Sequence, residues 1–293
     1  MLQHKKQNMM KIQPDFLKEN SSQPVLKFFT SLFIFFLWFS PTKANNVVTT
    51  GATIRINSGA FVTTLQNVVI ENDGKLTNEG KLILKKNLTN QNTDSELGSG
   101  AIEFSGTTAQ YISGQNTIGS LVVNNPAGLD IAGNTTINTE LALQNGHIRL
   151  STNNLTLSSL ATVTGTLSAS SMVIATGIGE LRKSFSGVGS FTYPVGDNSD
   201  ITEYSPVTIS FTGGTFTAEN YVGVKLTNSA YPGYSGNNLN RYWSLTQNGI
   251  TDYQYDAVFQ YATDDISENT SVLRSIKVEP KPIVSCNLAS TNL

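Results

Sequence analysis

The chain has 293 residues, enough for one large or two ordinary domains, and charged residues make up only 14 % of it. Thr, Ser, Asn and Gly replace the missing charge, and because these residues are poor helix formers, no long helices are expected. A formal net charge of −2, without a Lys/Arg run in the body of the chain, argues against nucleic acid as a partner.

Residues 1–44 have the composition of a secretory signal peptide. Lysines precede the apolar run Phe28–Phe39, which has 12 residues and is too short to cross a hydrocarbon core of about 30 Å. Small residues at Thr42 and Ala44 predict cleavage after Ala44, and an uncleaved N-terminal anchor is the alternative. Cleavage removes six lysines and two acids, so the mature chain has a net charge of −6. The mature chain is expected to have no transmembrane span. It is also expected to have no internal disulfide, because Cys286 is the one cysteine.

Residues 45–175 are expected to form a parallel β-helix. Short alternating pairs such as Leu82/Leu84 put two apolar side chains on one face of a short strand. Apolar anchors recur every 19 to 22 residues, at Val62, Leu82, Ile102, Leu121, Leu141 and Val163. Three short strands in each period of about 20 residues predict stacked coils around an aliphatic column, with Asn side chains stacking at the corners. An antiparallel sandwich, which also has short strands and frequent turns, is the alternative.

Residues 176–267 are expected to form an antiparallel β-sandwich-like module that caps the solenoid. Aromatic residues become frequent and the strand-like stretches lengthen, as in Thr215–Leu226. Gly213-Gly214 and Asn248-Gly249 are read as turns between these strands. Residues 268–293 are expected to be an extended or disordered tail, because Pro280 and Pro282 do not suit a central strand. The module is expected to be incomplete, since the last predicted strand has no partner after it.

The segment Leu121–Leu157 resembles the repeat region of large secreted surface proteins of Bacteroidota. Three further motifs resemble the segment that follows those repeats: Tyr193-Pro194-Val195-Gly196, Tyr204-Ser205-Pro206-Val207 and Asn240-Arg241-Tyr242-Trp243. The resemblance spans about residues 95–265 and implies export by the type IX secretion system and a secreted or outer-surface location. Such proteins commonly end in a sorting domain. This chain departs from the family there, which leaves a fragment of a larger surface protein as an alternative.

No catalytic residue and no cofactor is predicted. His147 stands at an expected corner without a second His or Cys nearby, whereas a zinc site needs three or four ligands. Glu79 and Glu140 fall near one column but about three coils apart, which is too far for paired acid–base catalysis.

The best local acidic cluster comprises Asp197, Asp200 and Glu203. It is a weak calcium candidate, because it lacks the alternating acids and central glycine of the common calcium loop, and a polar turn is the preferred interpretation. No other metal site is predicted.

Two surface features could bind sugars or regular lattices. Tyr242 and Trp243 could stack on a sugar, but simple alternation favours an inward Trp243 and an outward Tyr242. The pairs Thr63-Thr64 and Thr135-Thr136 are too irregular in register for a flat threonine ladder.

The expected function is that of a non-enzymatic secreted or cell-surface structural protein, adhesin-like, whose partner is an extracellular glycan or a surface protein. A carbohydrate-active β-helix, either a polysaccharide lyase or a glycan-binding module, is the first alternative, and it rests on fold analogy. A truncated fragment without independent function is the second.

Overall fold

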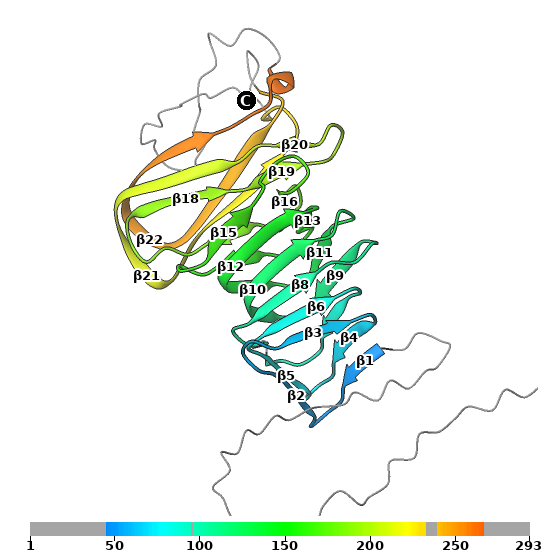
Figure 1. Cartoon of the computed structure of the whole chain (residues 1–293). Coiled ribbons are helices and arrows are strands. Elements are labelled where there is room, and N and C mark those ends of the chain that lie inside the picture. The colour runs from blue at the N-terminus through cyan, green and yellow to red at the C-terminus, as the bar shows by residue number, and fades with distance from the viewer. Residues whose placement is uncertain (1–44, 95, 233–238, 267–293) are drawn as a thin grey trace, which may run out of the picture. The chain divides into compact units, whose positions relative to one another are not determined.

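A computed structural model describes residues 45–94, 96–232 and 239–266, and this part of the chain is all-β (Figure 1). The predicted signal peptide 1–44 and the whole of the predicted tail 268–293, which includes Cys286, lie outside the described residues. The described residues contain strands and one 3-10 helix, η1 (Thr263–Asp265). None of their helices has the length and apolar character needed to cross a membrane.

The first two coils each contain three short strands. These strands are β1 (Asn45–Val48), β2 (Thr53–Ile56), β3 (Phe61–Thr64), β4 (Asn67–Ile70), β5 (Lys75–Asn78) and β6 (Lys81–Leu84). Each strand of the first coil pairs in parallel with its equivalent in the second: β1 with β4, β2 with β5 and β3 with β6. The pattern continues for about eight turns of about 20 residues, which confirms the predicted solenoid.

Parallel pairing along the stack makes continuous faces. One face is a nine-stranded sheet in the order β1-β4-β7-β9-β11-β13-β16-β19-β20, in which only β19 and β20 are antiparallel. Its further members are β7 (Leu88–Asn90), β9 (Gln110–Ser113), β11 (Leu129–Ala132), β13 (Ile148–Arg149), β16 (Val173–Ile174), β19 (Val195–Asp197) and β20 (Glu203–Tyr204).

The second large sheet has 11 strands: nine follow one another in the order β18-β21-β17-β14-β12-β10-β8-β6-β3, and β15 and β22 pair beside β12 and β21. Besides β3 and β6 it contains β8 (Ala101–Phe104), β10 (Asn116–Asn124), β12 (Thr135–Asn145), β14 (Leu155–Leu157), β15 (Thr162–Gly165), β17 (Leu181–Lys183), β18 (Gly189–Tyr193), β21 (Val207–Thr227) and β22 (Tyr242–Phe259). β10 pairs with β12 along two stretches, and the register shifts between Ile118 and Ser120. One long strand therefore serves two successive faces of the coil.

The core is an aliphatic column inside the coils. The predicted anchors align in one file of register partners: Val62, Leu82, Ile102, Leu121, Leu141 and Val163. The four middle members are buried, whereas Val62 in the first coil is half-buried. Burial of apolar surface contributes about 25 cal/mol per Å², so this column is the main stabilising feature of the solenoid.

Asn and Gly occupy the corners, as predicted. Asn67 Nδ2 donates to Asn45 Oδ1 in the preceding coil at 3.0 Å, and Asn87 N–H donates to Asn67 Oδ1 at 3.2 Å. Gly146 has φ +90°, and a Cβ there would lie 1.8 Å from the Asn125 carbonyl oxygen. The coils therefore approach too closely at this corner for any side chain.

The parallel pairing extends beyond the predicted boundary at residue 175. β16 pairs in parallel with β19, and β14 pairs in parallel with β17. β17 then pairs with β21 on its other side in the antiparallel direction. The antiparallel part of 176–267 is present, but it continues the 11-stranded sheet of the solenoid instead of forming a separate sheet.

β21 and β22 form one long antiparallel hairpin, which curves across the upper part of Figure 1. The prediction of turns at Gly213-Gly214 and Asn248-Gly249 is wrong, because both pairs lie inside these strands. The pairing register shifts on both sides of Gly213, and Gly214 has φ +143°. A glycine between two strands commonly makes a turn, whereas a glycine inside a strand commonly marks a bulge or bend. Gly213 and Gly214 have the second role and permit an irregularity that bends the hairpin of β21 and β22.

Candidate functional site

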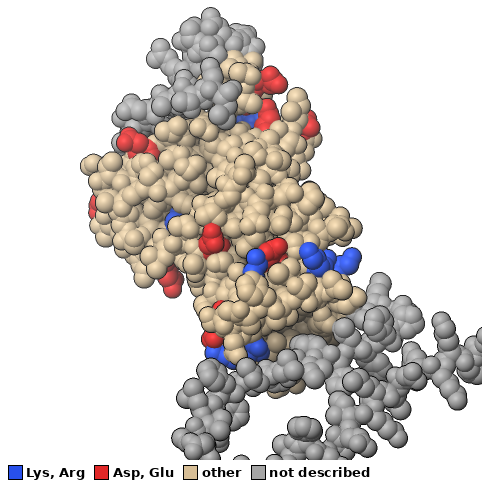
Figure 2. Space-filling model, viewed as in Figure 1, with Lys and Arg blue, Asp and Glu red and all other residues tan. Residues whose placement is uncertain are grey.

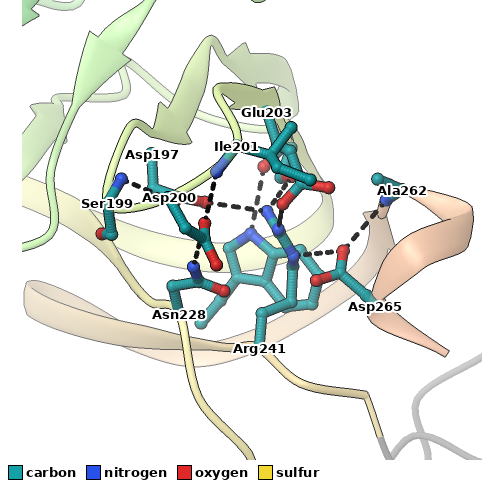
Figure 3. Close-up of polar contacts among 11 residues, drawn as sticks. Asp197, Ser199, Asp200, Ile201, Glu203, Asn228, Arg241, Ala262 and Asp265 are labelled. Carbon is teal, nitrogen blue, oxygen red and sulfur yellow. Dashed lines mark hydrogen bonds and ion pairs between the residues drawn. The ribbon is translucent and has the colours of Figure 1, made fainter. Parts of the chain in front are cut away.

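The predicted acidic cluster lies on the hairpin formed by β19 and β20. The structure brings Asp197 and Glu203 together and leaves Asp200 apart (Figure 3). The Asp200 carboxylate accepts hydrogen bonds from the Ile201 N–H at 2.7 Å and from Asn228 Nδ2 at 2.9 Å. The three acids therefore do not converge on one point.

Arg241, at the start of the β22 segment, occupies the centre of this site. Its side chain has 0 % exposure, and Nη1 lies 3.2 Å from Asp197 Oδ2. Nη1 also donates to Ser205 Oγ, Nη2 donates to Glu203, and Nε forms an ion pair with Asp265 in η1. One guanidinium thus joins the last coil, the long hairpin and the 3-10 helix (Figure 3).

Neighbouring groups fix this arrangement. The Ser199 N–H donates to Asp197 Oδ1 at 3.3 Å, and the Ala262 N–H donates to Asp265 Oδ2 at 3.1 Å. Trp243 Nε1 donates to the Ser205 carbonyl oxygen at 3.0 Å, which holds Ser205 beside the guanidinium. These contacts orient Asp197, Asp265 and Ser205 toward the Arg241 guanidinium.

The site contains three carboxylates and one buried cation. Burial raises the pKa of Asp197, and Arg241 opposes this shift less strongly. Burial likewise raises the pKa of Glu203, with Arg241 again opposing. A calcium ion would need open carboxylate oxygens, but the Arg241 guanidinium already donates hydrogen bonds to those of Asp197 and Glu203. The described residues hold no group of three His, Cys, Asp or Glu that could bind a metal. The arrangement can act as an electrostatic clamp.

Arg241 and Asp265 were not predicted as members of this site. The motif Asn240–Trp243 drew attention to its aromatic residues, although the available signal was a lone arginine in a segment poor in charge. Such an arginine must find carboxylates if it is buried. No sequence pattern pointed to Asp265, because it reaches the hairpin of β19 and β20 only through the folding of β22.

Lys183 is a second buried cation that the sequence did not reveal. Its Nζ donates to the carbonyl oxygens of Ser158, Ser159 and Ala161 at 2.6, 3.0 and 2.6 Å. Burial lowers its pKa to about 8. The ammonium satisfies the loop carbonyls that precede β15, at the level where parallel pairing gives way to antiparallel pairing.

The other candidate residues have structural partners. His147 Nε2 lies 2.7 Å from the Ala169 carbonyl oxygen in the next coil. Glu79 forms an ion pair with Arg55 at 2.7 Å, and Glu140 accepts a hydrogen bond from Thr164. Glu79 and Glu140 lie three coils apart, which at the spacing of adjacent strands is about 14 Å. A retaining or inverting glycosidase pair requires a shorter separation.

The aromatic and threonine candidates belong to the packing of the module and the coils. The ring of Trp243 lies 5.1 Å from that of Phe259, and the half-buried indole packs against the core. The ring of Tyr242 lies 5.2 Å from that of Tyr231. Thr64 and Thr135 are buried, so the predicted threonine pairs do not present a flat exposed ladder.

Several charged side chains of the solenoid connect neighbouring coils. Four ion pairs do so: Arg55–Glu79 at 2.7 Å, Lys75–Asp94 at 3.8 Å, Lys81–Glu103 at 2.6 Å and Asp130–Arg149 at 2.5 Å. Each such pair stabilises the fold by only about 0–1 kcal/mol at a surface. The pairs therefore matter more for matching the charges of neighbouring coils than for the stability they add. On the face seen in Figure 2, charged groups are few and scattered among uncharged residues.

Comparisons with protein families, with curated proteins and with solved structures find no match for this chain.

Proposed function

We propose that this chain is a non-enzymatic structural protein of the cell exterior, adhesin-like, which presents its surface to an extracellular glycan or to a surface protein. The observation that carries the proposal is the use of charge in the solenoid. The carboxylates of Glu79, Asp94, Glu103 and Asp130 each face a cation of an adjacent coil. Side chains used in this way stabilise the stack and are not gathered for acid–base chemistry.

The buried clamp around Arg241 supports the same proposal. It is the densest ionisable cluster noted among the described residues, and its guanidinium and carboxylates are directed at one another. A protein that carries mechanical or adhesive load at the cell exterior, without disulfides, benefits from fixed ends and a long ladder of backbone hydrogen bonds. The export signal expected in residues 1–44 and the resemblance to Bacteroidota surface proteins give the proposed location.

Turnover and attachment test the proposal directly. Full-length chain is incubated with pectin, alginate, xylan and chitin, and newly released reducing ends are measured. We expect none. In parallel, cells that express the chain and cells that lack its gene are compared for attachment to surfaces coated with mucin, and we expect attachment to fall in the deletion strain. Turnover that disappears in Glu79→Gln or Glu103→Gln would overturn the proposal in favour of a carbohydrate-active β-helix.

A further inference from the structure

The first coil leaves three strand edges open. β1 ends the nine-stranded sheet, β3 ends the 11-stranded sheet, and β2 ends the two-stranded sheet. Within the described ranges, no strand pairs with the other side of any of the three. We call this set of edges, residues 45–65, the first-coil edge.

The open edges present backbone groups ready for pairing. The Val48, Ile56 and Thr64 carbonyl oxygens accept hydrogen bonds from the second coil at 3.0, 2.8 and 3.0 Å. Bonding direction alternates along a strand, so the intervening residues Val47, Arg55 and Thr63 direct their N–H and C=O groups away from the second coil. An exposed row of this kind is a template for another strand.

Apolar side chains accompany the open backbone. Phe61 is 74 % exposed, Leu65 is 67 % exposed and Val47 is 42 % exposed. Val62 and Ile54 point inward but are only half-buried, whereas their register partners Leu82 and Leu76 in the second coil are buried. The aliphatic column thus continues to the end of the stack, where the described residues cover it on one side only.

The first-coil edge lacks the features that keep strand edges apart. Residues 45–65 contain no Lys, no Asp, no Glu and no Pro, and their one charged residue is Arg55. Arg55 is neutralised by Glu79 of the second coil. Monomeric proteins usually protect an edge with charges, prolines or bulges. Within residues 45–65, no unpaired charge, proline or bulge opposes the approach of an identical edge.

We propose that the first-coil edge binds the same edge of a second copy of this chain, end to end. A coil offers three edges of four residues each, and a second coil matches all three at once, whereas a single peptide strand matches one. A two-fold axis perpendicular to the stack pairs the strands in the antiparallel direction and brings like surfaces together. At the other end of the stack, β17 already accepts an antiparallel strand, β21. The expected cleavage after Ala44 makes Asn45, the first residue of β1, the N-terminus of the mature chain.

Two substitutions and one matched control test this interface. Full-length chain is purified, its N-terminus is determined by mass spectrometry, and its mass in solution is measured by sedimentation over a range of concentrations. Phe61→Lys places a charge on the edge, and Thr63→Pro removes an N–H that faces away from the second coil, so neither is expected to disturb the coil. Ile178→Lys is the control, because Ile178 is 73 % exposed but lies near β17.

We expect twice the mass of one chain for the wild type and for Ile178→Lys. We expect a dissociation constant raised at least about tenfold in Phe61→Lys and in Thr63→Pro. A wild type that stays monomeric up to its solubility limit overturns the proposal, as does a dimer that both edge variants leave intact. Hydrogen exchange at residues 61 and 63 gives a second readout that needs no variant. Protection that grows with protein concentration supports the dimer, and protection in a monomer shows that another part of the same chain covers the edge and refutes it.

Discussion

Replacing Arg241 by methionine tests the electrostatic clamp most sharply. The substitution keeps much of the side-chain volume but leaves Asp197, Glu203 and Asp265 without their shared cation. Removing one partner of a buried ion pair costs about 3–5 kcal/mol, because the remaining charge stays buried. Here two of the three carboxylates are almost completely buried, so we expect Arg241→Met to fall in that range.

The assay is denaturant unfolding at pH 7, followed by circular dichroism and by hydrogen exchange along the hairpin of β21 and β22. Natural domains are stable by about 5–15 kcal/mol, so the loss is large enough to measure. The matched variant adds Asp197→Asn and Glu203→Gln to Arg241→Met. Because it removes two of the uncompensated charges, we expect it to recover part of the loss. If Arg241→Met is as stable as the wild type, the guanidinium does not hold the site together.

The same cluster fixes a pH dependence. Burial raises the pKa of Asp197 and of Glu203 above their ordinary values of 3.8 and 4.5. The folded chain therefore holds these protons to higher pH than the unfolded chain does, and the contribution of the cluster to stability falls as pH rises through the folded pKa values. Without Arg241 both pKa values rise further. We therefore expect the destabilisation by Arg241→Met to be greater at pH 7 than at pH 5.

Three further substitutions test the stack, the corner and the second buried cation. Phe104 has 0 % exposure, so Phe104→Ala is expected to cost about 3–5 kcal/mol in denaturant unfolding. Gly146→Ala places a Cβ against the Asn125 carbonyl oxygen at positive φ, and we expect a lower melting temperature, whereas Gly187→Ala, in open space, should change little. Lys183→Met leaves three carbonyl oxygens without their donor, at about 1–3 kcal/mol for each group left unsatisfied. Because burial lowers the Lys183 pKa to about 8, wild-type stability should rise between about pH 8 and 10.5, and a rise that survives in Lys183→Met would contradict this origin.

The solenoid was predictable because its signal is repeated. Each coil buries the same file of positions, so anchors such as Leu82, Ile102 and Leu121 recur at a period that the sequence displays without any structure. The corners were predictable for a related reason, since close approach of the coils admits only small or backbone-mimicking side chains. Repetition allowed weak local preferences to add up along 130 residues.

The end of the stack was not predictable in the same way. β21 and β22 occur once, so no period supports their register, and glycine pairs inside them resemble turns as much as bends. The partners of Arg241 come from segments 24 to 44 residues away, and local patterns cannot identify contacts over such separations. The acids of the loop at Asp197 were visible, but the cation that defines their role was not.

The change of strand direction at β17 has a consequence for how this chain can vary in length. A coil inside the stack contacts only its two neighbours, so duplication or deletion of a whole period in the interior conserves every kind of contact. β17 is parallel to β14 on one side and antiparallel to β21 on the other, and no further coil can be added on that face. The antiparallel hairpin therefore works as a terminator, while the coils between it and β1 form a segment whose length evolution can adjust one turn at a time.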